Sequence, residues 1–348
     1  MGYWFQVLLT TVAAATVLVT GLLILSRLIS AQSRGKKLVQ ALGIPRPAVI
    51  AHRGASYLAP EETRPAYLLA RELGADYLEC DIQRTKDGVL IALHDDDLYR
   101  TSDVADVFPG REKDTIDTFT FAELQQLDAG SWFNRHSSDR ARDSFRGLRI
   151  LRLEDVIDIA ETGSHRPGLY IETKAALRFP GIEQQLVTTL TARGWIGHVE
   201  SAGPARIIFQ SFEPESLARF KMLAQEIPRL LLIDEVRMSK AGWESLLKTA
   251  AEIGVGIGTW GYRWACGPHW SIKDAPTRYV MTWPWHTGQA HRAGLFVHSW
   301  TIDDRWEMWM VTLSGADGIF TNRAELALAA YSRSGPIDLD KLWNKIGY

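Results

Sequence analysis

The chain has 348 residues, of which 46% are hydrophobic and 23% are charged, as in an ordinary globular protein with a sizeable core. Its formal net charge of −2 gives no electrostatic case for binding nucleic acid, and its two cysteines, Cys80 and Cys266, form no disulfide framework that would indicate a compartment. The length suggests about two domains, although single α/β barrels routinely reach about 250 residues.

The N-terminal segment Tyr3–Ser26 carries no charged side chain. As a helix it would be about 36 Å long, enough to cross a hydrocarbon core of about 30 Å. We expect residues 1–30 to form an uncleaved, single-pass transmembrane anchor, followed by a basic linker over residues 31–47. The alternative is a signal peptide cleaved near Ala31, whose apolar region would usually span only about 7–15 residues.

The basic residues of this region come after the apolar segment, at Arg27, Arg34, Lys36 and Lys37. This order favours the anchor, because a signal peptide usually has its basic residues at the start. For an anchor, the positive-inside rule then places the rest of the chain in the cytoplasm.

Three short, largely apolar segments follow, and we predict a strand at each: Ala48–His52, Asp76–Ile82 and Val89–His94. Between the first two, Thr63–Leu73 has a helix pattern with a proline near its start and a glycine just past its end. A strand, a crossover helix and a second strand make a βαβ unit, whose strands pair in parallel. Because parallel strands share one direction, the side chains at their carboxyl ends should converge on one face.

Residues that could bind a metal or take part in catalysis lie at these strand ends. Glu79 and Asp81 are two residues apart on one strand, so both point to the same side, while Cys80 turns away as a small buried hydrophobe. Two carboxylates on one face repel each other unless a cation lies between them, which indicates a metal site. His52 and His94 come from different strands and could flank a substrate as general acid and general base.

The segment 96–150 shows no strand pattern but is too long for a bare loop. Its residues Thr120-Phe121-Ala122-Glu123 form a capping box that predicts a short helix through Leu127. Apolar anchors are present at Phe119, Phe121, Trp132 and Phe133. We therefore interpret the segment as a folded insertion and not as a disordered linker.

From Leu153 onward, helix and strand patterns alternate. Leu153–Glu161 is the first helix, and later strands are predicted at Leu169–Thr173, Arg206–Gln210, Arg229–Ile233, Val255–Gly258, Leu295–Trp300 and Asp317–Phe320. With the first three, these make nine candidates for a closed barrel of eight strands. Val255–Gly258 is short and rich in glycine, so we expect it to be the least complete.

Glu172 and Lys174 follow the same two-residue spacing at the end of the fourth predicted strand. Glu172 would be a third oxygen ligand for a metal, and Lys174 would be a fixed positive charge for an anionic substrate. Together with Arg53, the two histidines and a hard divalent cation, they fit a phosphate ester better than a neutral substrate.

Most of the 13 tryptophans fall between Trp260 and Trp309. Trp300 ends a predicted strand and should face the mouth of the barrel. Others have two open interpretations, a lipid-facing rim above an anchored domain or aromatic packing among long loops. These are Trp264, Trp270, Trp283 and Trp285.

Five motifs resemble, in order, those of the glycerophosphodiester phosphodiesterases: His52-Arg53-Gly54, Pro60-Glu61-x-Thr63, Glu79-x-Asp81, His94-Asp95 and Glu172-x-Lys174. Later motifs are similar too, namely Gln210-Ser211-Phe212, Trp300-Thr301 and Gly318-Ile319-Phe320-Thr321. The resemblance extends from about Ala48 to the helix pattern after Asn322. The chain departs from it at Glu62, where the family usually has Asn, and at Thr321-Asn322-Arg323-Ala324, where it usually has Thr-Asp-x-Pro.

The resemblance implies a (β/α)₈ TIM barrel over residues 48–332, with an insertion at 96–150 after the third strand and over the barrel mouth, and a C-terminal tail at 333–348. The implied reaction is metal-dependent hydrolysis of a glycerophosphodiester to glycerol 3-phosphate and an alcohol. The insertion looks most like that of periplasmic members, which opposes the cytoplasmic side given by the charge rule.

The resemblance also implies a role for each site residue: metal binding (Ca²⁺ or Mg²⁺) for Glu79, Asp81 and Glu172, phosphate binding for Arg53 and Lys174, acid–base catalysis for His52 and His94, a supporting role for Glu61 and contact with glycerol for Trp300. The nucleophile is either water or a substrate hydroxyl, which would first give a cyclic phosphate. Two alternative functions are a lysophospholipase D, which acts on a lipid that retains an acyl chain, and a catalytically silent barrel that only binds.

Overall fold

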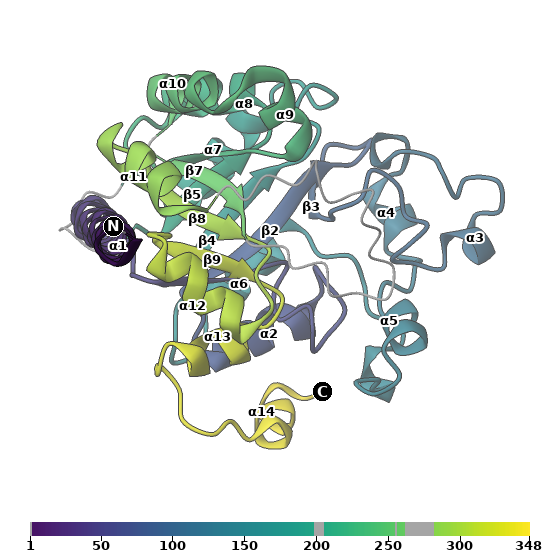
Figure 1. Cartoon of the computed structure of the whole chain (residues 1–348). Helices are drawn as coiled ribbons and strands as arrows, with labels where there is room; N and C mark the ends of the chain where they lie inside the picture. The colour runs from purple at the N-terminus through teal and green to yellow at the C-terminus, as the bar shows by residue number, and fades with distance from the viewer. Residues whose placement is uncertain (1, 198–204, 255, 262–281) are drawn as a thin grey trace.

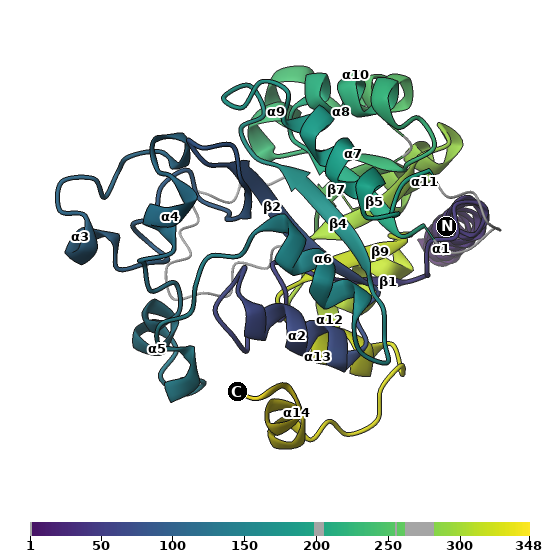
Figure 2. The same ribbon diagram turned by 180° about the vertical axis from the view of Figure 1, so that it is seen from behind.

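The computed structural model describes residues 2–197, 205–254, 256–261 and 282–348. Its centre is a closed barrel of eight parallel strands surrounded by helices (Figures 1 and 2). The strands are β1 (Ala48–Ala51), β2 (Tyr77–Arg84), β4 (Gly168–Thr173), β5 (Ile207–Ser211), β6 (Arg229–Leu232), β7 (Gly256–Trp260), β8 (Phe296–Trp300) and β9 (Gly318–Thr321). Pairing of β1 with both β2 and β9 closes the barrel. The predicted (β/α)₈ architecture is confirmed.

The ninth strand of the sheet, β3 (Leu90–Ala92), corrects one expectation. It pairs antiparallel with β2, so it is a hairpin partner at the edge and not a barrel strand. The cause is the short connection after β2, where Thr85 N donates to Val89 O over 3.0 Å. A turn of that size can join only antiparallel strands, whereas parallel pairing needs a crossover of a dozen or more residues.

The strand β7 corrects a second expectation, because it pairs with both neighbours and is a complete member of the barrel. Its glycines make room for large neighbours. A Cβ atom on Gly256 would lie 2.4 Å from the ring of Phe296, and one on Gly258 would lie 2.7 Å from Leu230 and Leu232. The glycine content that made the segment look incomplete is therefore a packing requirement of the barrel interior.

The outer layer consists of α2 (Arg64–Leu73), α6 (Leu153–Glu161), α7 (Ile182–Ala192), α8 (Pro214–Leu223), α9 (Glu235–Ala241), α10 (Trp243–Ile253), α11 (Pro284–Arg292), α12 (Arg305–Leu313) and α13 (Ala324–Ala330). Helix α2 has the predicted ends. Pro65 lies in its first turn, and Gly74 ends it in the left-handed conformation with φ 94°, donating its N–H to carbonyls of the last turn. The predicted helix Leu153–Glu161 is also present as α6.

The insertion between β3 and α6 is folded and lies to one side of the barrel, beyond β3 and opposite α1 (Figures 1 and 2). It contains α3 (Val104–Val107), η1 (Ile116–Thr118), α4 (Phe121–Leu124), α5 (Ser131–His136) and η2 (Asp143–Phe145). Its own apolar cluster includes Phe119 and Leu124, both fully buried. The predicted capping box at Thr120 and Glu123 is confirmed, and the interpretation as a disordered linker is excluded.

The N-terminal helix α1 (Gly2–Ala41) runs beyond the predicted anchor and through the first part of the expected linker, which is a correction. The end of the helix is held by packing against the barrel, where Val39 is buried and a Cβ atom on Gly35 would collide with Asp317. Its apolar part is exposed, and the helix is long and apolar enough to cross a membrane, a property it shares with signal sequences.

The chain end is also structured. Helix α14 (Leu339–Ile346) lies in the segment expected to be a tail, and its Trp343 packs edge-on against Phe145 of the insertion, with ring centroids 5.6 Å apart. Of the tryptophans with two open interpretations, Trp264 and Trp270 lie outside the described residues. Trp283 and Trp285 stack on each other at 5.0 Å and are 38% and 50% exposed.

Candidate active site

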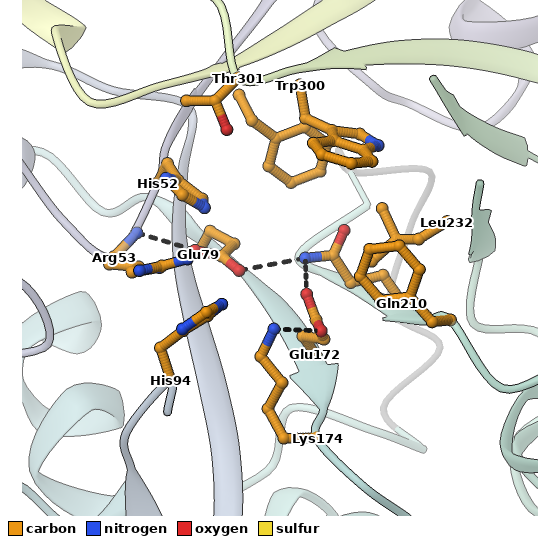
Figure 3. Close-up of a pocket in the computed structure, with 12 residues that line it drawn as sticks. His52, Arg53, Glu79, His94, Glu172, Lys174, Gln210, Leu232, Trp300 and Thr301 are labelled. Carbon is orange, nitrogen blue, oxygen red and sulfur yellow. Dashed lines mark hydrogen bonds and ion pairs between the residues drawn. The ribbon is translucent and has the colours of Figure 1, made fainter. Parts of the chain in front are cut away.

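A cavity of about 220 Å³ opens at the carboxyl ends of the barrel strands, the end at which TIM barrels carry their active sites. Figure 3 shows its lining. Of the predicted site residues, His52, Arg53, Glu79, His94, Glu172, Lys174 and Trp300 line it. Asp81 lies just beneath, in contact with two of them. The residues singled out at separate strand ends therefore converge as expected.

His94 reaches this site by a different route from the one predicted. Because β3 is antiparallel, it approaches β2 from above the mouth, and Leu93 N donates to Asp81 O over 2.8 Å. His94 follows directly and descends to the level of the carboxylates, whereas the prediction placed it at the carboxyl end of a third parallel strand. The convergence is right, but the reason given for His94 is wrong.

Three buried carboxylates form the floor of the site. Glu79 and Asp81 share one face of β2, and Glu172 lies on β4 directly opposite Asp81 in the strand register. Gln210 from β5 connects two of them, because its Nε2 donates to Glu79 Oε1 over 3.1 Å and to Glu172 Oε2 over 3.4 Å (Figure 3). Gln210 thus belongs to the site, although the sequence analysis gave it no role.

Two cationic side chains balance these carboxylates. Lys174 Nζ lies 2.6 Å from Glu172 Oε1 and 3.2 Å from Asp81 Oδ1. Arg53 Nε lies 3.2 Å from Asp81 Oδ2, and the Arg53 backbone N–H donates to Glu79 Oε2 over 2.7 Å. Both side chains also line the cavity, so they can contact an anionic substrate.

Burial and crowding set the protonation of the carboxylates. Burial, together with the charge of Asp81, raises the pKa of Glu79 well above its ordinary value. Burial also opposes ionisation of Asp81, but Lys174 and Arg53 outweigh it and hold the pKa of that carboxyl below its usual value. Without a further positive charge, burial and crowding therefore oppose ionisation of Glu79, while Asp81 keeps its charge beside two cations.

The donor set fits a hard divalent cation. Neither oxygen of Asp81 accepts a hydrogen bond within the described part of the chain, although the residue is only 1% exposed. Buried carboxylate oxygens that are balanced by charge but lack hydrogen bonds are suited to ligate an ion. The expected ligand set contains only oxygen atoms, which Ca²⁺ and Mg²⁺ prefer.

The tightest carboxylate group among the described residues differs from the predicted trio. Ligand atoms of Glu62, Glu79 and Asp81 lie within 4.8 Å of one another. Glu62 is held by its neighbours, since it accepts a hydrogen bond from the Asp81 N–H over 3.1 Å and another from the Tyr67 hydroxyl. Glu172 is not part of this group, and its Oε1 is paired with Lys174, so its role as a metal ligand stays a prediction.

The two histidines have different partners. His52 Nδ1 lies 2.8 Å from Asn322 Oδ1, and Asn322 Nδ2 donates to Asp303 Oδ2 over 2.7 Å. Because the amide nitrogen faces the carboxylate, the amide oxygen faces the histidine, so Nδ1 donates and Nε2 is left without a proton. Burial, reinforced by Arg53, lowers the pKa of His52 to about 3, which keeps the ring neutral.

His94 instead contacts a carboxylate. Its Nδ1 lies 2.7 Å from Asp95 Oδ1, and Asp95 in turn accepts from Arg100 Nε over 2.6 Å. The two Nδ1 atoms therefore face different acceptors, a neutral amide oxygen at His52 and a carboxylate at His94. Both rings line the cavity, where they can reach a bound substrate.

Comparison with known proteins identifies the group to which this site belongs. The model of the "Glycerophosphoryl diester phosphodiesterase family" matches residues 52–326. The chain belongs to this family. A glycerophosphodiester phosphodiesterase of Bacillus subtilis is 32% identical over 298 residues, which cover 86% of this chain and 89% of the relative. The chain is therefore a phosphodiesterase, as the ordered motifs indicated.

Solved structures of the family share the fold. A putative glycerophosphoryl diester phosphodiesterase from Silicibacter pomeroyi matches with a TM-score of 0.64 at 24% identity, covering 84% of this chain and 96% of that one. A phosphodiesterase from Oleispira antarctica, solved in complex with the product sn-glycerol-3-phosphate, matches with a TM-score of 0.59 at 24% identity, covering 82% and 97%.

Several functional contacts of this family member were missed from the sequence. Asp95, Arg100 and Gln210 contact predicted site residues, and Asn322 with Asp303 orients His52. Asp95 and Gln210 stood inside quoted motifs, and Asn322 was noted only as a departure. Arg100 and Asp303 carried no signal of their own, because their roles arise from contacts between loops.

Proposed function

We propose that the chain hydrolyses glycerophosphodiesters to glycerol 3-phosphate and an alcohol, with Ca²⁺ or Mg²⁺ as its cofactor. The observation that carries this proposal is the single cavity in which three carboxylates, two cationic side chains and two histidines meet. A neutral substrate would have no use for Arg53 and Lys174 at the cavity wall, whereas a phosphodiester anion binds to both.

In this proposal Glu79, Asp81 and Glu172 hold the cation, with Glu62 beside them. When bound, the cation supplies charge neutralisation at a phosphate oxygen. Arg53 and Lys174 bind the remaining phosphate oxygens and hold the phosphorus in the cavity. The surrounding strands are rigid and buried, so these side chains are oriented before the substrate arrives.

The two histidines then divide the proton transfers. His52, with its unprotonated Nε2, takes the proton of the nucleophile, and His94, beside Asp95, gives a proton to the leaving oxygen. If the nucleophile is water, the diester is hydrolysed directly. If it is a glycerol hydroxyl, a cyclic phosphate forms first and water opens it in a second step. Trp300, whose ring packs edge-on against Phe212 at 5.8 Å, gives a flat wall for the glycerol carbons.

A second candidate function is a lysophospholipase D, favoured by the exposed apolar part of α1 and by the exposed Trp283 and Trp285. The two functions differ only in whether the substrate keeps an acyl chain. We would compare turnover of glycerophosphocholine and lysophosphatidylcholine by the same preparation. Faster release of choline from glycerophosphocholine supports the first function, and faster release from the lysolipid supports the second. Release from neither would favour a barrel that only binds.

We further propose that α1 is an uncleaved membrane anchor, on the strength of its length and uncharged composition. Helical packing of its last turns against the barrel would then connect the membrane segment to the enzyme without a flexible linker. The full-length chain should stay with membranes after a carbonate wash, and its mass should include residues 1–30. A soluble form starting near Gln32 would contradict the anchor and place the enzyme outside the cytoplasm.

A further inference from the structure

One arginine of the insertion holds two carboxylates of the active-site rim. Arg100 Nη1 and Nη2 donate to the two oxygens of Glu61 over 2.8 and 2.6 Å. The same guanidinium donates through Nε and Nη2 to the two oxygens of Asp95 over 2.6 and 3.0 Å. Both contacts are bidentate, a geometry that the rigid, planar guanidinium provides and an ammonium group does not.

Each of these carboxylates contacts a different cavity-lining side chain. Asp95 Oδ1 lies 2.7 Å from His94 Nδ1, and Glu61 Oε1 accepts from Arg53 Nη1 over 2.9 Å. His94 and Arg53 line the substrate cavity. Arg100 therefore touches neither reacting group itself, but it connects the carboxylate behind the histidine to the carboxylate behind the phosphate-binding arginine.

Stability does not account for this arrangement. The Arg100 side chain is 42% exposed, so water screens its ion pairs and limits what their bidentate geometry adds to folding. The ring of Trp132 in α5 lies 5.7 Å from the guanidinium carbon, so the insertion supports the side chain from its far side. What the contacts fix is the direction in which Asp95 and Glu61 present their oxygens.

We propose that Arg100 is a positioning residue through which the insertion sets the geometry of the active site. Its guanidinium holds Asp95 against His94 and Glu61 against Arg53, so that the proton-donating and phosphate-binding groups keep a fixed separation. The insertion then serves the reaction through this one side chain. This inference rests on the proposed diesterase function, which the test below separates from it.

The chain offers a matched control in the same insertion. Arg111 also bridges two carboxylates, with Nε 3.0 Å from Asp114 and Nη1 2.8 Å from Glu123, and its side chain is 30% exposed. The described residues give it no contact with the cavity. Arg111→Gln therefore removes a similar pair of ion pairs without touching the site, and its thermal unfolding gives the reference for a purely structural loss.

The experiment measures kcat and KM for glycerophosphocholine with the full chain in detergent and saturating Ca²⁺, for wild type, Arg100→Gln, Arg100→Lys and Arg111→Gln. We expect Arg100→Gln to lower kcat/KM by about 10- to 100-fold. The kcat should fall because His94 loses its positioning for proton transfer, and the KM should rise because Arg53 loses its positioning for phosphate binding. Arg111→Gln should stay within about twofold of wild type, and both glutamine variants should unfold at similar temperatures.

Two further variants test the connection itself. Lysine keeps the positive charge but cannot make the bidentate contacts of the planar guanidinium, so Arg100→Lys should recover only part of the activity lost in Arg100→Gln. Glu61→Gln should raise KM, and combined with Arg100→Gln it should lose less than the product of the single effects, because both act on Arg53. Full recovery by lysine, or strictly independent effects, would contradict the positioning role.

The outcomes separate this inference from the proposed function. A wild-type chain that hydrolyses no diester would overturn the function, and the inference with it. A fully active wild type whose Arg100→Gln variant matches Arg111→Gln would overturn only the inference. Calorimetric binding of sn-glycerol 3-phosphate gives a readout besides turnover, and its affinity should fall in Arg100→Gln and not in Arg111→Gln.

Discussion

The two ends of the barrel both bury charged side chains, but they treat them differently. At the amino end, Asp317 is fully buried and accepts three hydrogen bonds, from Arg46 Nε at 2.8 Å, from His291 Nε2 at 2.8 Å and from Val297 N at 2.9 Å. At the carboxyl end, Asp81 is equally buried, yet its oxygens have ion-pair partners and no hydrogen bonds among the described residues.

This contrast shows what distinguishes a structural buried charge from a functional one. A saturated carboxylate such as Asp317 has no capacity for a ligand, and removing it leaves Arg46 and its other hydrogen-bond donors without their acceptor. An unsaturated one such as Asp81 can take up a cation without losing hydrogen bonds. In TIM barrels the amino end typically contributes stability and the carboxyl end activity, and here the hydrogen bonding of the carboxylates follows that division.

The largest effect is expected from a substitution among the carboxylates at the barrel mouth. Glu79→Gln should lower turnover by about a thousandfold, because a cation ligand is lost at the phosphate-binding centre. Burial and Asp81 raise the pKa of Glu79, so without a cation a neutral amide at this position relieves charge crowding. The free energy of unfolding in EDTA should therefore not fall. A large loss of stability, or near-normal turnover, would contradict the division between the ends.

The matching change at the amino end is Asp317→Asn. It should destabilise the fold by about 3 kcal/mol, since Arg46 loses the carboxylate that neutralises it and the hydrogen bonds of His291 and Val297 to that carboxylate are disturbed. Turnover per folded molecule should remain close to that of wild type. Urea unfolding and kinetic assays on the same sample measure both quantities. Loss of kcat without loss of stability would remove the distinction between the two ends.

The pH dependence of stability tests a buried group inside the barrel, His298. Burial lowers the pKa of this histidine from 6.5 to about 4, so the folded state keeps it neutral while the unfolded chain takes up a proton. Its contribution to stability is thus complete above about pH 6.5 and is lost as the pH falls toward 4, by about 3 kcal/mol. In His298→Gln, the free energy of unfolding should fall less over this range. An unchanged slope would contradict the assignment.

The smallest expected effect is at Glu172, which the structure pairs with Lys174 outside the tightest carboxylate group. Glu172→Gln keeps the size and removes a charge, so it should weaken Ca²⁺ affinity by about tenfold with little change in stability. Calorimetric titration of Ca²⁺ measures the affinity directly. Unchanged metal dependence would remove Glu172 from the ligand set.

The barrel could be predicted because each strand is a local apolar run, and the site residues because most stand at strand ends. Local pattern failed where pairing depends on neighbours. It could not show that β3 turns back to pair with β2. Nor could it show that Gly256 and Gly258 belong to a complete strand, in which they leave room for larger neighbouring side chains. The extension of α1 to Ala41 was missed for the same reason, since packing against the barrel stabilises it.

The supporting contacts of the site were harder to predict than its lining. His52 and Asn322 meet only when the barrel closes between β1 and β9, and Arg100 reaches Glu61 only when the insertion folds. Such contacts have no spacing in the sequence that could reveal them. Residue type and strand position therefore predicted which groups face the substrate, while the groups behind them required the structure.

We propose that the carboxylates at the barrel mouth bind a divalent cation that the phosphodiesterase reaction requires. The most direct test is hydrolysis of glycerophosphocholine by the full-length chain after exhaustive chelation and then after adding back single metals. We expect chelation to abolish turnover and Ca²⁺ or Mg²⁺ to restore it better than Zn²⁺, because every expected ligand is an oxygen. Undiminished turnover after chelation would contradict it.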